Sequence, residues 1–469
     1  MQNLLKKYGI KMPEILLPSD KVNLTKWSVV ACDQYTSQPD YWNMVKDEVG
    51  SSPSTLKLTF PEIYLKDFDK EERINKINKT MEDYLADGTL KPCKPCFVLV
   101  ERSTPNAASR KGLVLAVDLE CYDYSKGSTT LIRATEGTIL DRIPPRVKIR
   151  ENAPIELPHI MLLIDDPDRT LIEKLYDRND SFEKLYDFVL MQGGGHIRGW
   201  RIDDTESISI IEKALERLTD PQVLEEKYGS SAPFLFAAGD GNHSLASAKA
   251  HWENVKASLN SPDDIENHPA RYALVEVVNV YDEGLTFEPI HRVLFGVDGT
   301  SVLEKIKGLY SSSASDHSYI AYSLYNSKEA MEAALHSIAE AAAGNETTCS
   351  CGLCNCAAIR LHMLPFILEG KYGLITVSNP DTSLEAGTLQ SIIDKLIKSV
   401  PEIEVDYIHG EQAVTEMGSK KDTMGFYLPA MNKHALFRTV ISDGVLPRKT
   451  FSMGEAEEKR YYLECRKIR

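Results

Sequence analysis

The sequence predicts an α/β (α+β) fold, in which short buried strands alternate with amphipathic helices. Short apolar runs bounded by turn-forming residues, such as Gly112–Leu119 (GLVLAVDL) and Tyr272–Tyr281 (YALVEVVNVY), are typical of strands buried on both faces. Longer segments with helical periodicity, such as Lys70–Leu85, lie between such runs. Because the spacing of strands and helices is irregular and no long-period repeat occurs, both the α/β and the α+β class fit.

The first part of the chain combines short helices and loops over about 90 residues and then becomes rich in strands. The apolar runs predict strands at Pro95–Glu101, Gly112–Leu119, Leu131–Ala134 and Ile160–Ile164. Helical periodicity predicts helices at Thr170–Leu190 and Ser207–Tyr228, the second ending at Gly229, a residue typical of the position after a helix. A further strand, helix and strand are expected at Ala232–Ala238, Leu245–Leu259 and Tyr272–Tyr281.

A second α/β segment is expected beyond a seam at Asp298–Gly308. Helices are predicted at Lys328–Ala342, at Leu384–Ser399 and after Gly410, and strands at Ala357–Leu364, Gly373–Ser378, Glu404–His409 and Gly425–Pro429. The expected organisation is therefore an N-terminal helical and loop segment (1–90), a core with the candidate site (91–298) and a C-terminal α/β domain (299–469).

Charge and apolar content disfavour several classes of function. The 469 residues include 54 basic and 69 acidic side chains, a net charge of −15, whereas nonspecific nucleic-acid binding needs a basic face. No apolar run approaches the roughly 18 residues of a membrane span, and the start of the chain lacks a signal-peptide pattern. Without an export signal, the nine cysteines are expected to be thiols in a reducing compartment, which predicts a cytoplasmic protein.

The most informative segment is FLFAAGDGNHSLASAKAHW, in which an apolar strand runs into a helix. The first N–H groups of a helix are unpaired and form a ready anion site, and Gly239 and Gly241 permit close backbone approach. Asp240 can orient a hydroxyl group or hold Mg²⁺ beside a phosphate, and His243 can donate to a phosphoryl oxygen or transfer a proton. The alternative is ordinary turn chemistry, with Asn242 or Ser244 as the helix cap.

A basic stretch, LIRATEGTILDRIPPRVKIR (131–150), is the second candidate. Its cations are Arg133, Arg142, Arg146, Lys148 and Arg150. Arginine forks match phosphate geometry, and Glu136, a carboxylate among cations, stays ionised and suits a base toward a substrate hydroxyl. A solvated loop with offsetting charges remains the alternative.

Four further segments carry weaker signals. A glycine run precedes His196 in MQGGGHIRGWRI, and His291-Arg292 interrupts an apolar strand in FEPIHRVLFG. Asp33, Gln34 and Tyr35 lie in a polar loop that can line a pocket. Soft-metal binding is possible at four closely spaced thiols, for which a surface loop is the alternative: Cys349, Cys351, Cys354 and Cys356. Cys93 and Cys96, flanked by prolines, are expected to be structural.

Five segments together resemble one bacterial family, the domain of unknown function 1015, across nearly the whole chain. They are VVACDQYTSQPDYW, RATEGT…DR, GDGNHSLA, EPIHRVLF and LPRKTFSMGEAEEKRYYLE, which occur in the family's order. The family is often described as ParB-like, and its motif, commonly Asp-Gly-His-His-Arg, is similar to the nucleotide-site motif of ParB and sulfiredoxin-like folds and of the archaeal free serine kinase. The resemblance implies a ParB/sulfiredoxin-like core.

Carried over by position, Asp240 and Gly241 match the motif, and His243 matches its second histidine. Asn242 and Ser244 depart from it, and Ser244 replaces the arginine that grips phosphate. Phosphate binding is then expected from the helix N-terminus together with Arg133, Arg142 or His291-Arg292. Glu136 is similar to the glutamate base of the serine kinase.

These observations predict a nucleotide-dependent phosphotransferase that acts on a small hydroxylated metabolite, with serine or phosphoserine as the first candidate. Glu136, Asp240 and His243 are its expected catalytic residues, and Mg²⁺ with ATP or ADP its expected cofactors. Expected partners are the substrate and the nucleotide; neither a membrane nor nucleic acid is expected. The sequence leaves open whether the chain forms a homo-oligomer. The alternatives are a nucleotide-binding ParB-like regulator and a hydrolase of a phosphorylated metabolite.

Overall fold

The structure is a computed structural model, which describes residues 5–65, 68–157, 159–311, 319–344 and 360–469. The chain divides into two compact units. The first comprises Met1–Thr286, Lys433–Val445 and Met453–Arg469, and the second comprises Phe287–Asn432 and Leu446–Ser452. These units differ from the three segments expected from the sequence, because the first 90 residues pack onto the core and the end of the chain returns to the first unit.

The first unit is built on a ten-stranded mixed sheet with the order β10-β11-β4-β5-β13-β9-β12-β7-β6, in which β1 also pairs with β5. Its strands are β1 (Ile10–Lys11), β4 (Phe97–Ser103), β5 (Arg110–Asp118), β6 (Tyr122–Asp123), β7 (Ile132–Ala134), β9 (Met161–Ile164), β10 (Lys184–Val189), β11 (His196–Ile202), β12 (Phe236–Asp240) and β13 (Tyr272–Asn279). Two small sheets pair β2 (Leu16–Pro18) with β3 (Leu90–Pro92) and β8 (Ile155–Glu156) with β21 (Arg466–Lys467).

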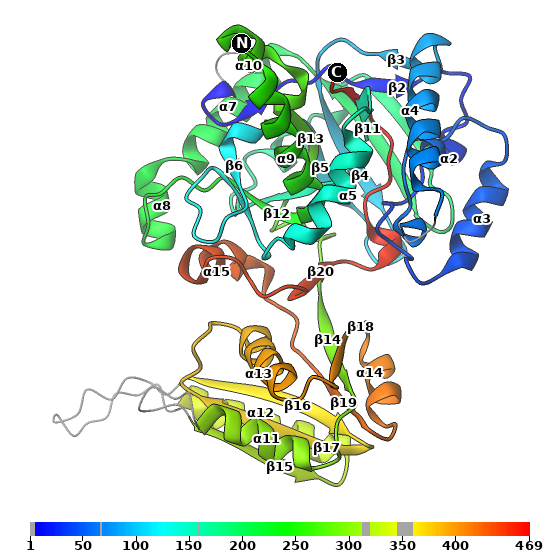
Figure 1. Ribbon diagram of the computed structural model, residues 1–469. Helices are drawn as coiled ribbons and strands as arrows, with labels where there is room; N and C mark the ends of the chain where they lie inside the picture. The colour runs from blue at the N-terminus through cyan, green and yellow to red at the C-terminus, as the bar shows by residue number, and fades with distance from the viewer. Residues whose placement is uncertain (1–4, 66–67, 158, 312–318, 345–359) are drawn as a thin grey trace. The chain divides into compact units, whose positions relative to one another are not determined.

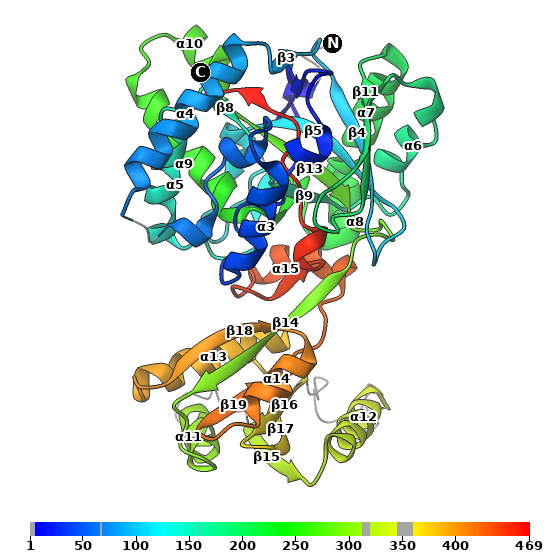
Figure 2. The same cartoon turned by 90° about the vertical axis from the view of Figure 1, so that its right-hand side faces the viewer.

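Helices cover both faces of this sheet (Figures 1 and 2). They are α2 (Leu24–Trp27), α3 (Pro39–Val49), α4 (Lys70–Ala86), α5 (Ile143–Arg150), α6 (Ile172–Tyr176), α7 (Thr205–Leu218), α8 (Pro221–Tyr228), α9 (Asn242–Ser258), α10 (Pro262–Asn267) and α15 (Leu436–Asp443). Helices α5 and α9 lie side by side in both views. That pairing brings the basic stretch of the sequence next to the helix that follows Asp240.

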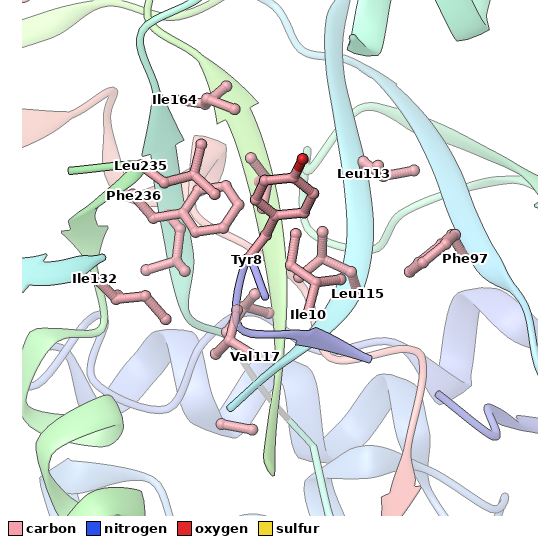
Figure 3. Packing of buried hydrophobic residues seen from close by; sticks show 14 of the residues in the cluster. Tyr8, Ile10, Phe97, Leu113, Leu115, Val117, Ile132, Ile164, Leu235 and Phe236 are labelled. Carbon is pink, nitrogen blue, oxygen red and sulfur yellow. The ribbon is translucent and has the colours of Figure 1, made fainter. Parts of the chain in front are cut away.

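Alternation along the central strands divides the apolar core into two layers. Phe97 and Leu99 of β4 face one layer together with α6, α7 and α9, whereas Val98 and Val100 face the other together with α3 and α4. Figure 3 shows the first layer, where Tyr8 and Ile10 from the N-terminal segment pack among strand residues such as Leu115. Burial on both faces explains why these strands read as continuous apolar runs.

The second unit holds a seven-stranded sheet with the order β15-β17-β16-β19-β14-β18, in which β20 also pairs with β14. Its strands are β14 (Phe287–Phe295), β15 (Tyr319–Tyr325), β16 (Leu361–Leu368), β17 (Lys371–Ser378), β18 (Glu404–His409), β19 (Thr423–Phe426) and β20 (Phe451–Met453). Its helices are α11 (Ser301–Ser311), α12 (Lys328–Gly344), α13 (Glu385–Ser399) and α14 (Glu411–Gly418). Leu364 and Phe366 of β16 pack with α11 and α13, whereas Ile367 packs with α12 and α14 on the opposite face.

The predicted α/β class is confirmed, but one predicted helix is wrong over much of its length and another is divided into two helices. Only Ile172–Tyr176 of the expected helix Thr170–Leu190 is helical, and the second half is strand β10, which pairs with β11. The Leu/Tyr pattern fits either a helix or a strand, and pairing with β11 at the edge of the sheet selects the strand. The expected helix Ser207–Tyr228 is interrupted, because Asp220 caps a new helix that has Pro221 in its first turn. Gly229 ends that helix in the left-handed conformation, as predicted.

Most of the remaining elements lie within a few residues of their predicted bounds. The predicted strand Ala357–Leu364 is described only from residue 360, and β16 begins at Leu361. Among the helices in the described part of the chain, none combines the length and the apolar character needed to cross a membrane.

The last residues of the chain are fixed to the first unit by a buried ion pair. Arg466 is 6% exposed, and its Nε donates to Glu156 Oε1 at 2.8 Å. Its Nη1 donates to the Pro269 carbonyl at 2.9 Å. Glu156 also pairs with Arg150 of α5. The chain end therefore braces the end of α5, next to the α9 helix.

Arg466→Met is expected to lower the free energy of unfolding by about 3–5 kcal/mol, because it leaves the Glu156 carboxylate buried with one fewer partner. The measurement is urea unfolding followed by circular dichroism. Lys467→Met is the matched control, since Lys467 is the next residue and is exposed, and it should stay within about 0.5 kcal/mol of the wild type. A loss for Arg466→Met no larger than that of the control would show that the pair does not hold the chain end.

Candidate functional site

The candidate site lies where two parallel strands end at the same edge of the large sheet. Strands β7 and β12 are parallel neighbours, with Ala134 opposite Ala238. Immediately after β7, the Thr135 hydroxyl donates to the Ala238 carbonyl at 2.5 Å. The loop that carries Glu136 and the turn that carries Asp240 therefore leave the sheet side by side, so two residues that are 104 positions apart in the sequence share one edge.

The turn after β12 requires glycine at position 241. Gly241 has φ +73°, and a Cβ atom there would lie 3.0 Å from the Ile160 Cα. Its neighbour Gly239 is equally confined, because an added Cβ would meet the Met453 sulfur at 2.4 Å. Gly241 therefore lets the backbone turn sharply from strand to helix, whereas Gly239, within β12, allows close packing against Met453.

Helix α9 begins at this turn without a side-chain cap. It is 17 residues long, and its N-cap residue, Gly241, has no side chain that could cap the first turn. The side-chain Nδ2 of Asn242 donates to the Ala238 carbonyl, four residues earlier in the chain, at 3.3 Å. The Asn242 Oδ1 is buried without a partner among the described residues. A helix N-terminus attracts an anion through its dipole and the N–H groups of its first turn.

Asp240 is held in place from two sides. Its Oδ1 accepts the Gly241 N–H at 2.8 Å, and its Oδ2 lies 3.2 Å from the Lys459 Nζ. The Lys459 side chain is 8% exposed, against 20% for Asp240. A buried lysine therefore places a positive charge beside the end of β12.

The backbone around Lys459 is fixed by buried arginines. The Arg102 guanidinium donates to the carbonyls of Glu457, Glu458 and Lys459 and also to that of Gly194. Arg110 donates to the Glu458 carbonyl at 2.9 Å. Three successive carbonyls, the last of them that of Lys459 itself, are thereby bonded to guanidinium groups. These bonds preorganise the backbone that carries the lysine side chain.

The loop after β7 reaches the first turn of α9. The Ile139 N–H donates to the His243 Nε2 at 3.4 Å, so this nitrogen acts as an acceptor. Glu136, three residues earlier, is half-buried. The loop that carries Glu136 therefore contacts the helix that begins directly after Asp240 and contains His243.

A second polar group adjoins the same turn and is centred on His159, which is 7% exposed. Its Nε2 lies 3.2 Å from the Ser244 Oγ and 3.6 Å from the Asp33 Oδ2. Its Nδ1 lies 2.9 Å from the Tyr462 hydroxyl, which accepts the Cys32 N–H at 3.1 Å. His159 thus links the polar loop of residues 31–42 and the chain end to α9.

Burial and charge shift the pKa values of His159 and Asp33 in opposite directions. Burial alone lowers the pKa of His159, but the Asp33 carboxylate outweighs it, and the pKa of His159 is raised from its usual value. Burial likewise raises the pKa of Asp33, but the charge and hydrogen bond of His159 lower it below its usual range. The pairing with Asp33 therefore favours the protonated form of His159.

Folding stability is expected to decrease as the pH rises through the raised pKa of His159. The folded state binds this proton more tightly than the unfolded state, so its stabilisation is complete below the unfolded pKa of about 6.5 and is lost above the folded value. Thermal melting between pH 5.5 and 9 measures the decrease. In Asp33→Asn the decrease should shrink and move to lower pH; an unchanged profile would show that Asp33 does not set this pKa.

A cavity of about 160 Å³ adjoins this group, and it includes Ser244, His159 and Tyr462 in its wall. Two ion pairs line it as well, Arg146 with Glu62 and Arg150 with Glu156. Cys32 also lines it, but burial raises the pKa of its thiol to about 12, which excludes a thiolate nucleophile at neutral pH.

The cations predicted to bind phosphate differ in their surroundings. Arg133 is 6% exposed, donates to the Thr130 and Pro233 carbonyls at 3.0 and 2.8 Å and stacks on Phe234, so its guanidinium stabilises the loop around β7. Arg142 is exposed next to the first turn of α5.

His291 and Arg292 belong to β14 of the second unit, not to the unit that contains α9. Arg292 is fully buried and donates to the Arg448 carbonyl at 3.2 Å, and the His291 Nδ1 accepts the Leu428 N–H at 3.0 Å. The His291-Arg292 pair therefore has local structural contacts within its own unit.

The glycine run before His196 and the cysteines are the remaining weak candidates. The glycine run before His196 forms the turn between β10 and β11, with Gly193 and Gly195 at positive φ. Cys93 and Cys96 are free thiols, and burial raises the pKa of both. The four clustered cysteines, Cys349, Cys351, Cys354 and Cys356, lie outside the described residues.

Comparison with known protein families shows to which family the chain belongs. The model of the family described as protein of unknown function (DUF1015) matches residues 15–439. The chain belongs to this family. A comparison with curated proteins finds no match.

Several solved structures are similar at low level. A conserved hypothetical protein from Pyrococcus furiosus is 12% identical with a TM-score of 0.32, covering 75% of this chain and 90% of its own. A free serine kinase in complex with AMP is 10% identical with a TM-score of 0.35, covering 78% and 95%. A mutant of a free serine kinase in complex with ADP is 10% identical with a TM-score of 0.36, covering 79% and 95%.

Sequence reasoning missed His159, Tyr462 and Lys459 in this member of the DUF1015 family. No motif marks His159, and Lys459 and Tyr462 lie about 200 residues after the end of α9. The one available signal was the C-terminal segment GEAEEKRYYLE, which carries both residues and was noted only as part of the family resemblance.

Proposed function

We propose that this chain transfers a phosphoryl group from a nucleotide to a small hydroxylated metabolite at the N-terminus of α9. The observation that carries the proposal is the convergence of the N-terminus of a 17-residue helix, the Asp240–Lys459 pair and the Glu136 loop at one sheet edge. Phosphoryl transfer depends mainly on positioning and on neutralising charge, and these groups supply both. The sequence resemblance supports a nucleotide as the donor, and serine is the first acceptor to test.

In this reaction each group has a distinct role. The N–H groups of the first turn of α9 and the Lys459 ammonium hold the phosphoryl oxygens. Asp240 orients the acceptor hydroxyl and keeps Lys459 in position. The hydroxyl oxygen forms the new bond to phosphorus, the bond to the bridging oxygen of the nucleotide breaks, and Glu136 takes the hydroxyl proton.

Lys459 offers a substitute for the arginine that the motif lacks. Ser244, at the arginine position, bonds with His159 instead of carrying charge. The lysine reaches the same helix start from the end of the chain, on a backbone clamped by Arg102. We therefore propose that Lys459 binds phosphate together with the helix N-terminus. This replaces the prediction that Arg133, Arg142 or His291-Arg292 supplies the cation.

Mg²⁺ fits this site only as an ion that arrives with the nucleotide. The described residues contain no cluster of three or more His, Cys, Asp or Glu side chains that could hold a metal. Mg²⁺ in nucleotide sites commonly uses one or two carboxylates together with the phosphates, and Asp240 can supply one such ligand. A bound ion would neutralise phosphate charge.

Nucleotides are expected to stabilise the wild-type protein, whereas Lys459→Met should bind them about 10–100-fold more weakly, the effect of losing one charge-assisted hydrogen bond. Thermal shift with ATP and ADP, each with and without Mg²⁺ and serine, is the measurement. A ligand at 100 times its Kd adds about 2.7 kcal/mol of stability.

Lys467→Met is the control, because it removes an exposed lysine from the same chain end. It should bind nucleotides as the wild type does. Equal affinity of Lys459→Met and the wild type would remove Lys459 from phosphate binding, and a wild type that no nucleotide stabilises would contradict the proposed function as a whole.

A further inference from the structure

The cavity beside α9 has a mainly apolar wall. Side chains from the segment after α3, from α4, from α5 and from the residue after β8 form this part of it: Leu58, Phe60, Leu65, Met81, Ile149 and Leu157. Its volume is about 160 Å³. A void of about 150 Å³ lined by Leu, Ile and Phe side chains holds one benzene molecule. The cavity therefore has room for one ring-sized apolar group, and it is larger than a serine side chain needs.

The polar part of the wall lies toward the first turns of α9. Ser244 and Ser247 of α9 line the cavity together with His159, whose Nε2 is 3.2 Å from the Ser244 Oγ. Ser247 donates to the His243 carbonyl at 2.7 Å, so its hydroxyl is already engaged in the helix. A ligand that fills the apolar part can thus present a polar group to Ser244 and His159, next to the proposed phosphate site.

The charges on the wall are balanced. Arg146 pairs with Glu62, and their side chains are 17% and 21% exposed. Arg150 pairs with Glu156, which also binds Arg466. Because each arginine already faces a carboxylate, this wall offers little attraction to a second phosphate or another polyanion.

We infer that the cavity binds the acceptor, and that the acceptor is an uncharged or zwitterionic alcohol bearing one ring-sized apolar group. The inference rests on the proposed phosphoryl transfer, since it takes the bound alcohol as the acceptor, whose polar end lies toward Ser244 and His159 in the first turns of α9, the helix that begins directly after the Asp240 turn. The apolar group gains free energy by leaving water, and the polar end keeps its hydrogen bonds in the site.

The test compares 2-phenylethanol with ethanol, which share a primary hydroxyl and differ in the ring. Isothermal titration and thermal shift of the full chain should detect binding of 2-phenylethanol and at least about tenfold weaker binding of ethanol. Ile149→Trp, which fills the cavity, should abolish the difference, and Ala153→Leu is a second filling variant in case the first is poorly folded. Val189→Phe, at an exposed position on β10, should behave as the wild type.

Nucleotide binding is measured on the same proteins to separate the two claims. Filling variants that lose 2-phenylethanol but keep the nucleotide-induced shift support the inference. Equal binding of ethanol and 2-phenylethanol, or undiminished 2-phenylethanol binding by both folded filling variants, would overturn it while nucleotide binding stands. A wild type that binds 2-phenylethanol but no nucleotide would overturn the proposed function, and with it the assignment of this ligand as an acceptor.

Discussion

Asp240→Asn is expected to lower phosphoryl transfer by at least about 10²-fold while the protein remains folded. The change keeps the size of the side chain and an oxygen that can accept the Gly241 N–H, which is 2.8 Å away in the wild type. It removes the negative charge that faces Lys459 at 3.2 Å and that orients the acceptor hydroxyl. The measurement is turnover with nucleotide and acceptor, together with thermal melting of the same variant.

A matched control separates the site from general loss of charge. Asp263 is exposed in the first turn of α10, so Asp263→Asn should change neither turnover nor melting appreciably. Full activity of Asp240→Asn would show that this carboxylate has no role in the reaction. Unfolding of Asp240→Asn would show that its pairing with Lys459 is needed chiefly for the fold.

Glu136→Gln should lower turnover about 10²–10⁴-fold and leave nucleotide affinity nearly unchanged, because a general base acts in the transition state. Glu136 lies two residues after β7, whose end is bonded to the end of β12 through Thr135. This position allows its carboxylate to reach an acceptor at the start of α9. Turnover and nucleotide titration of the variant test the role.

Glu151→Gln provides the comparison within the same basic stretch. Glu151 is exposed and lies 3.3 Å from the Lys148 ammonium, so its loss should cost about 0–1 kcal/mol and leave turnover intact. If Glu136→Gln behaves like this control, with near-normal turnover and a lower melting temperature, Glu136 is an ion-pair partner and Asp240 is the remaining candidate for the base.

Local sequence patterns predicted most strands and helices because their burial is regular. Strand β5, buried on both faces, reads as one apolar run, and α4 shows a helical stripe. The pattern failed at residues 184–189, where the same Leu/Tyr spacing fits a helix or an edge strand, and pairing with β11 decides between them. It also failed at Asp220-Pro221, where a strong cap starts a second helix.

The candidate site was predictable in part. Asp240, Gly241 and His243 follow one another along the chain, so a strand–turn–helix pattern reveals them. Glu136 joins them because β7 and β12 are parallel neighbours, a pairing that no local pattern contains. Lys459 and Tyr462 reach the site only because the chain returns to the first unit after residue 452, and this return depends on distant contacts such as that of Arg102 with the Lys459 carbonyl.

The most direct test of phosphoryl transfer at α9 is detection of the phosphate ester itself. Wild-type protein and Asp240→Asn are incubated with ATP or ADP labelled in the terminal phosphate, together with serine and a panel of primary alcohols, and the products are separated and identified by mass spectrometry. Transfer at this site predicts a labelled phosphate ester with the wild type and at least about 10²-fold less with Asp240→Asn. Release of inorganic phosphate alone, or equal ester yields from both proteins, would contradict it.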